Sequence, residues 1–164
     1  MRDAAGPMDE LVEDLCSKDP ATRTSARRYL IVRGPEAIPS LVSLLRAPEQ
    51  HVRWEAAKTL EGIAHPSAVV AMVEALADPD GDVCWVAAGA LVAIGESALK
   101  PLFVRLTCEP SPAQPAPDQL YQGAHHVLHR LAQQTGSCKY DELLNALSHE
   151  DPELAVPQAA AKLL

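Results

Sequence analysis

Apolar residues recur along this chain in two alternating patterns. The first pattern has the spacing i, i+4, i+5, i+8, as in Val52, Ala56, Ala57 and Leu60. The second has the spacing i, i+1, i+4, i+5, i+8, as in the segment 37–45. Both spacings gather the apolar side chains on one stripe of an α-helix, whereas a strand would alternate them between two faces. The chain is therefore predicted to be helical throughout.

The two patterns repeat at a step of about thirty residues. Segment 52–60 matches segment 83–91 with a shift of 31 residues, and segment 37–45 recurs at 68–76 and again at 98–106. Each repeat is thus a first helix followed by a second helix. Repeats of this length cannot bury their apolar stripes alone and stack on one another. The sequence predicts an all-α, right-handed α-solenoid of paired antiparallel helices, with about four to five units.

The same register extends toward both ends of the chain. Met8, Leu11, Val12 and Leu15 fit a second helix, and Asp19-Pro20 opens a first helix. Further on, 120–132 fits a first helix, 143–147 a second helix and 152–164 another first helix. We therefore expect one repeat domain over residues 1–164 that begins with a lone second helix and ends on a lone first helix.

The two predicted terminal helices differ in character. The opening helix is acidic, as the polar face of a terminal repeat requires. The closing helix carries Val156, Leu163 and Leu164 with no helix after it to cover them. A large apolar side chain that stays exposed loses the roughly 1.5–3 kcal/mol of stabilisation that its burial would provide. A truncated chain, a removed tail and self-association through this uncapped helix are the three interpretations.

The repeat motif resembles that of a known family. Asp78-Pro79, Val52-Arg53, Ala56-Ala57 and Leu60 resemble the HEAT-like repeats, in particular the short repeats of phycobilin lyase subunits. The resemblance covers nearly the whole chain. It implies the solenoid fold but not a function, because such solenoids serve many unrelated tasks.

Charge disfavours nucleic acid as a partner. The net charge is −8, and non-specific nucleic-acid binding draws most of its strength from Lys and Arg. Arginines at 23, 27, 28 and 33 gather on one predicted helix. They fit a solvated face that pairs with the neighbouring acidic helix as readily as they fit a binding patch.

The chain carries no sign of export or of a membrane. No apolar run is expected to be long enough to span a bilayer, and residues 1–6 lack the charged and then apolar order of a secretion signal. Cys16, Cys84, Cys108 and Cys138 are far apart and form no metal-binding motif. We expect free thiols, no zinc and a cytoplasmic location.

The resemblance offers one catalytic comparison. HEAT-like deoxyhypusine hydroxylases hold iron on His-Glu pairs in their first helices. The matching positions here are Trp54-Glu55 and Trp85-Val86, and His149-Glu150 lies in a predicted turn without a second copy. The resemblance therefore implies no iron site and no enzyme.

A histidine cluster gives only a weak metal signal. His125 and His129 are four residues apart on one predicted helix, but a metal site normally needs three or four ligands. The repeat register places His125 at a core position, with His126 and His129 facing solvent. We expect packing or surface roles for all three, and no cofactor.

A binding surface remains as the main functional prediction. In HEAT-like solenoids the second helices line the concave side, and small or apolar side chains there suit a helix or an extended peptide. The predicted groove consists of Pro39, Ser40, Ser43, Leu44, Val70, Ala71, Glu74, Ala75, Lys100, Pro101, Val104 and Arg105. The acidic first rung and the basic Lys100 and Arg105 would orient a bound segment.

The function predicted is a non-catalytic adaptor that binds a protein partner in this groove. A subunit of a phycobilin lyase-like enzyme or of another enzyme complex is the alternative, as is a fragment of a longer repeat array.

Two further features carry weaker predictions. Trp54 and Trp85 hold equivalent places on the convex side, where they are either contact anchors for a partner or covers for their own repeats. The segment 108–117 contains four prolines and lengthens one inter-repeat turn. Such a segment is extended and is either a docking segment or a tolerated insertion.

Overall fold

The computed structural model describes residues 7–107, 117–136, 138–148 and 152–164. Over these residues the chain forms helices and turns and no strand. The first helices are α2 (Pro20–Arg33), α4 (Gln50–Ile63), α6 (Gly81–Ile94) and α8 (Pro117–Thr135). The second helices are α1 (Met8–Leu15), α3 (Ile38–Leu44), α5 (Val69–Ala75) and α7 (Leu99–Thr107), and α9 (Asp141–Leu147) and α10 (Pro152–Ala161) follow.

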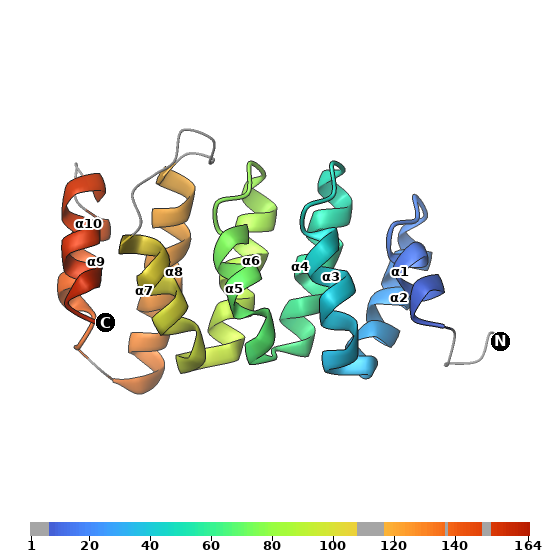
Figure 1. Ribbon diagram of the computed structural model, residues 1–164, viewed down its shortest axis with the longest axis horizontal. Helices are drawn as coiled ribbons and strands as arrows, with labels where there is room; N and C mark the ends of the chain where they lie inside the picture. Colours follow the sequence, from blue (N-terminus) through green and yellow to red (C-terminus); the bar gives the residue numbers. More distant parts are fainter. Residues whose placement is uncertain (1–6, 108–116, 137, 149–151) are drawn as a thin grey trace.

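The helices stack along one axis, as Figure 1 shows, with α3, α5 and α7 in front of the first helices. The predicted all-α solenoid of antiparallel helix pairs is confirmed. The predicted insertion at 108–117 lies outside the described residues except for Pro117, which begins α8.

Carboxylates at the helix starts set the repeat boundaries. The Asp19 side chain accepts a hydrogen bond from the Thr22 amide at 2.8 Å, and Asp80 Oδ1 accepts from the Asp82 and Val83 amides. These bonds satisfy amides that have no partner within the helix. Pro20 follows Asp19 at the first helical position, where proline is tolerated best. The Asp19-Pro20 step thus marks a helix start, whereas after Asp78-Pro79 the helix begins only at Gly81, with Asp80 as its N-cap.

Short 3₁₀ turns connect α2 to α3, α4 to α5 and α6 to α7. They are η1 (Gly34–Ala37), η2 (Pro66–Ala68) and η3 (Gly95–Ala98), and the sequence did not predict them. Gly34 has φ 64° and Gly95 has φ 81°, in a region that glycine enters without the steric cost of a Cβ. The chain therefore reverses within a few residues, and the second helix packs back against the stack.

Small residues allow the first helices to approach closely. Ala56, Ala57, Ala87 and Ala88 are all fully buried, and α4 packs against α2 on one side and α6 on the other. The second helices α1, α3 and α5 pack against the first helices α2, α4 and α6 that follow them. The Ala-Ala pair of the motif is thus the contact surface of the first-helix layer.

The motif arginine ties each repeat to the turn before it. Arg23 Nη1 donates to two carbonyls of the preceding turn at 2.9 and 3.0 Å, and Arg53 Nη1 does the same at 3.1 and 3.0 Å. In the next repeat Cys84 holds this place, and its Sγ donates to the Asp78 carbonyl at 3.0 Å. The arginine of the motif therefore donates to turn carbonyls that have no backbone donor in the described part of the chain.

Arg23 and Arg27 also bind one buried carboxylate. Both pair with Glu55 of α4, whose side chain is only 6% exposed. The expected pairing of these arginines with acidic residues exists, but the partner differs from the acidic neighbour α1 that the sequence suggested. Glu55 lies between the two first helices, where its charge is compensated from both arginines.

The C-terminal helix departs from the predicted register. Among the described residues α10 packs mainly against α7 and α9, and it does not continue the first-helix layer on α8. Val156, Ala159 and Ala160 are buried, so the prediction of an uncovered Val156 is wrong. An apolar stripe specifies the side of a helix that is buried but not the neighbour that buries it. Of the residues proposed for self-association, Leu164 remains exposed and Leu163 is partly buried.

One segment is long and apolar enough to cross a membrane by length and composition alone, so the expectation that no such run exists is wrong. The segment is Gly81–Thr107, which comprises α6, η3 and α7. Gly95 reverses the chain at its middle, and Figure 1 shows α6 and α7 running in opposite directions. Its apolar character serves the packing of α6 between α4 and α8.

Candidate functional site

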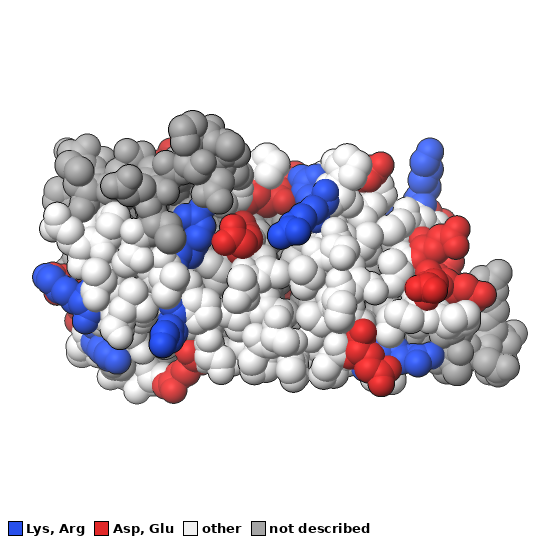
Figure 2. Space-filling model, viewed as in Figure 1, with Lys and Arg blue, Asp and Glu red and all other residues white. Residues whose placement is uncertain are grey.

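The face formed by α3, α5 and α7 carries few charges. Figure 2 shows a row of charged residues across its upper part and uncharged residues over most of the area below that row. Val70 on α5 is 66% exposed and Val104 on α7 is 46% exposed. Two branched apolar side chains on neighbouring helices are thus open to solvent on one side of the molecule.

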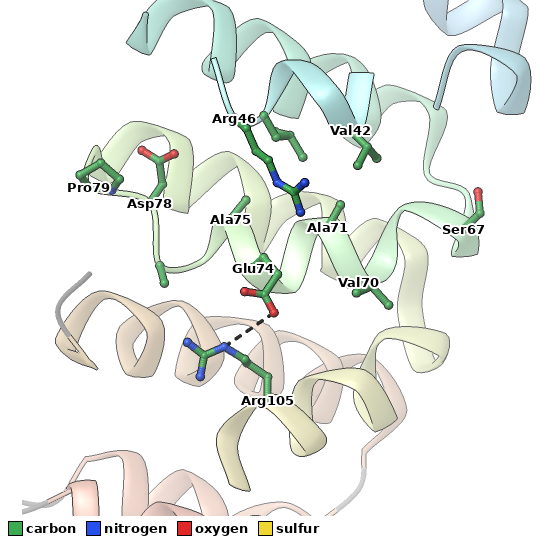
Figure 3. Close-up of a pocket in the computed structure, with 12 residues that line it drawn as sticks. Val42, Arg46, Ser67, Val70, Ala71, Glu74, Ala75, Asp78, Pro79 and Arg105 are labelled. Atoms are coloured by element: carbon green, nitrogen blue, oxygen red, sulfur yellow. Dashed lines mark ion pairs between the residues drawn. The ribbon is translucent and has the colours of Figure 1, made fainter. Parts of the chain in front are cut away.

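A cavity of about 390 Å³ lies between α3 and α5 and is drawn in Figure 3. Small side chains of α5 form its floor, and the turns that follow α3 and α5 form its walls. Its lining residues are Val42, Leu45, Arg46, Ser67, Val70, Ala71, Glu74, Ala75, Ala77, Asp78, Pro79 and Arg105.

A second cavity of about 360 Å³ lies between α5 and α7. Val70, Glu74 and Arg105 line both cavities, so the two are neighbours on the face formed by three second helices. The remaining lining residues of the second cavity are Val73, Lys100, Pro101 and Val104. We call the surface formed by the residues that line either cavity the second-helix groove.

Eight of the predicted groove residues line it. They are Val70, Ala71, Glu74, Ala75, Lys100, Pro101, Val104 and Arg105. The predicted residues of α3 line neither cavity: the Ser43 hydroxyl donates to the Pro39 carbonyl at 3.1 Å, Leu44 packs on the core, and Ser40 is half-buried. A role in partner binding stays a prediction for the whole set.

Sequence reasoning missed the part of the groove that comes from the inter-repeat turns. Arg46, Ala77, Asp78 and Pro79 follow second helices and fall outside the helical positions that the repeat register identified as non-core. Val42 and Leu45 belong to the apolar stripe itself, yet both are only partly buried. The spacing of apolar residues does not predict that these two side chains are partly exposed at the open edge of α3.

Asp78 contributes little free charge to the groove. Its side chain accepts hydrogen bonds from Arg53 at 2.8 and 3.0 Å and from the Asp80 amide at 2.9 Å. The hydrogen bond from Arg53 to Asp78 raises the pKa of Arg53, in spite of its partial burial. Asp78 is thus engaged inside the fold.

The other charged residues of the groove are Arg46, Glu74, Lys100 and Arg105. Arg105 Nε lies 3.9 Å from Glu74 Oε1, an ion pair too long for a direct hydrogen bond. Arg46 extends from the end of α3 over α5 (Figure 3). Over the described part of the chain, Arg46 and Lys100 take part in no ion pair. Positive charge is therefore present beside α3 as well as on α7, where the sequence predicted it.

The two tryptophans of the opposite face contact different neighbours. Arg27 of α2 lies over the Trp54 ring at 5.7 Å, and Trp54 is partly buried. Trp85 is 64% exposed, and its ring centroid lies 4.4 Å from that of His126 on α8. Burial lowers the pKa of His126, and Arg130 acts in the same direction. Each indole thus packs partly on an adjacent first helix, and Trp85 alone of the pair keeps a large open surface.

The histidine and cysteine residues form no metal cluster in the described ranges. The rings of His125 and His129 stack at 6.0 Å, and His129 Nε2 lies 2.9 Å from Gln133 Nε2. No group of three His, Cys, Asp or Glu side chains there is placed to hold an ion. His149-Glu150 and Cys108 lie outside the described residues.

Cys84 should be unreactive in the folded chain. Burial, followed by the Asp78 carboxylate, raises the pKa of its thiol to about 11, so the nucleophilic thiolate is scarce at pH 8. Cys138 is exposed. Brief iodoacetamide treatment at pH 8, read by peptide mass spectrometry, should modify Cys138 and leave Cys84 intact until denaturant is added. Modification of both at equal rates in the native chain would contradict the burial of Cys84.

The geometry agrees with the comparisons to known proteins. Residues 38–113, from α3 into the segment after α7, match the family model of HEAT repeats. HEAT repeats generally form protein-interaction scaffolds and are generally not enzymes. The resemblance found in the sequence is therefore confirmed for this segment.

One solved structure supports the fold over a longer range. The chain is similar to the crystal structure of an engineered protein from the Northeast Structural Genomics Consortium, with 24% identity and a TM-score of 0.50. That match covers 96% of this chain and 78% of the other. A second engineered protein of the same consortium matches at 26% identity with a TM-score of 0.49, covering 96% and 79%. No curated protein sequence matches the chain.

Proposed function

We propose that the chain is a non-catalytic adaptor that binds a segment of a protein partner in the second-helix groove. One observation carries the proposal: two neighbouring cavities lie on the same face as the exposed Val70 and Val104, and apolar side chains make up most of their lining. Contiguous apolar surface rimmed by polar residues is typical of an interaction site.

Covering the groove would contribute favourably to binding. Full burial of a valine side chain contributes about 1.5–3 kcal/mol, and Val70 and Val104 have roughly two thirds and half of that area still open. Ala71 and Ala75 are small, so a partner backbone can approach α5 closely. A helix or an extended segment laid into the groove would cover all four.

Capture experiments with matched variants test this proposal. The double variant Val70→Gln, Val104→Gln makes the groove polar without adding charge. Val32 on α2 is 84% exposed and lines neither cavity, so Val32→Gln is the matched control. Proteins captured from an extract of the source cells by the parent and by the control should be lost with the double variant, because their apolar contact is removed.

The opposite face provides the competing surface. Trp85 is 64% exposed and large aromatic side chains are frequent binding hot spots. A Trp85→Ala variant should therefore be run beside the groove variant. Loss of the captured proteins with Trp85→Ala and their retention with Val70→Gln, Val104→Gln would contradict the groove proposal.

A further inference from the structure

The charges that remain available in the groove indicate the chemistry of its ligand. We infer that the partner segment is an amphipathic helix that turns a small apolar centre toward α5 and carries carboxylates at its flanks for Arg46 and Lys100. This inference rests on the proposed function, since it specifies the partner of the same groove.

A helix fits the groove better than an extended strand. The lining of α5 comes from a helix whose own amides and carbonyls are already bonded within it, so it presents no open backbone edge. An extended segment pressed against Val70, Ala71 and Ala75 would bury amides and carbonyls without partners, at a cost of about 1–3 kcal/mol each. A helix satisfies these groups internally.

The length of the helix follows from the three second helices it must cross. α5 and α7 are in contact, and packed helices lie about 8–10 Å apart, so with α3 beyond α5 the three axes span at least roughly 16–20 Å. At about 1.5 Å per residue, a helix of roughly 11–13 residues covers that span. Small side chains at its centre allow it to approach the floor formed by Ala71 and Ala75.

The flanking charges of the partner follow from those of the groove. Asp78 is engaged by Arg53, and Glu74 faces Arg105, whereas Arg46 and Lys100 have no ion-pair partner over the described residues. The groove is thus locally positive in a chain with a net charge of −8. A guanidinium such as that of Arg46 can bind a carboxylate through two parallel hydrogen bonds.

Glu74 limits where those carboxylates can be. It lines both cavities at the middle of the groove and its side chain is 53% exposed. A carboxylate at the centre of the partner helix would meet this like charge. Acidic residues are therefore expected at the two ends of the partner segment, and complementarity of this kind fixes orientation and association rate more than affinity.

A displayed peptide library tests the inference. The probe is a library of 13-residue helix-forming peptides, with Ala, Val or Leu at the central i, i+3, i+4 positions and all residues allowed at the flanks. Peptides selected on the parent chain should be enriched at least fivefold in Asp and Glu at the flanks. Selection on Arg46→Glu, Lys100→Glu should shift the enrichment to Lys and Arg.

The controls separate this inference from the proposed function. Arg28 is exposed on α2 and lines neither cavity, so Arg28→Glu should keep the acidic preference. Peptides that lose binding to Val70→Gln, Val104→Gln but show no acidic enrichment, or that are Pro-rich and extended, would overturn the inference and leave the proposed function standing. Peptides insensitive to that double variant, or no selected peptides at all, would overturn both. Circular dichroism confirms that each variant remains folded.

Discussion

Replacement of Ala88 by arginine should prevent the chain from folding. Ala88 is fully buried on α6, which packs between α4 and α8. An arginine there brings a charged group and a long side chain into a closely packed helix interface, and no partner is available for the charge. The expected cost exceeds about 5 kcal/mol, which is comparable to the whole stability of a typical domain. Circular dichroism during thermal unfolding should show no cooperative transition.

Ala93 provides the control for this substitution. It lies on the same helix but is exposed, so Ala93→Arg should change the free energy of unfolding by less than about 0.5 kcal/mol. An Ala88→Arg chain that melts at the temperature of the parent would contradict the packing of the first-helix layer. Ala57→Arg should also abolish the cooperative unfolding transition, because Ala57 holds the equivalent buried place on α4.

Glu55→Ala should give the second largest loss of stability. Its carboxylate is 6% exposed and pairs with Arg23 and Arg27, which are 17% and 22% exposed. Removal of the carboxylate leaves two partly buried guanidinium groups without their anion. The breaking of a buried pair typically costs about 3–5 kcal/mol. Urea unfolding should show a loss of about 3 kcal/mol in the free energy of unfolding. This is the lower end of that range, because both arginines reach solvent.

Glu61→Ala is the control for Glu55→Ala. Glu61 pairs with Lys58 one turn away on α4, and both side chains are more exposed, at 26% and 40%. Exposed pairs of this kind contribute about 0.3–0.5 kcal/mol. Equal losses for the two variants would mean that Glu55 does not hold α2 to α4.

The helices and their order could be predicted because they depend on local signals. The apolar period gives the buried stripe, Asp19-Pro20 gives the start of α2, and the Ala-Ala pair gives the side that packs most closely. These signals are repeated from unit to unit, so an ambiguous segment such as 120–132 can be read by comparison with 52–60. The solenoid follows from the repetition itself.

The features that the sequence did not predict depend on long-range contacts. Glu55 has the charge of a surface residue, and only the approach of α2 makes its burial favourable. The position of α10 beside α7 and α9 depends on which neighbour covers Val156, and the period of apolar residues does not encode that choice. Both features depend on which helices are neighbours in the fold, and no local sequence pattern specifies that.

The candidate groove was predicted only in part for a related reason. Positions on α5 and α7 were found because their non-core faces line the cavities directly. On α3 the prediction chose Ser40, Ser43 and Leu44, whereas the groove uses Val42, Leu45 and Arg46. The open edge of a helix depends on its tilt against the next repeat, which a repeat register does not contain.

The central claim is that the second-helix groove is the partner-binding surface. Its most direct test is the affinity of a captured partner for three chains, measured by isothermal titration calorimetry: the parent, Val32→Gln, and Val70→Gln, Val104→Gln. The proposed contact predicts that the dissociation constant rises about tenfold or more for the double variant, because the apolar area of two valines is no longer covered. It also predicts that Val32→Gln binds as the parent does. Equal affinity for all three chains would show that the partner binds elsewhere on the solenoid.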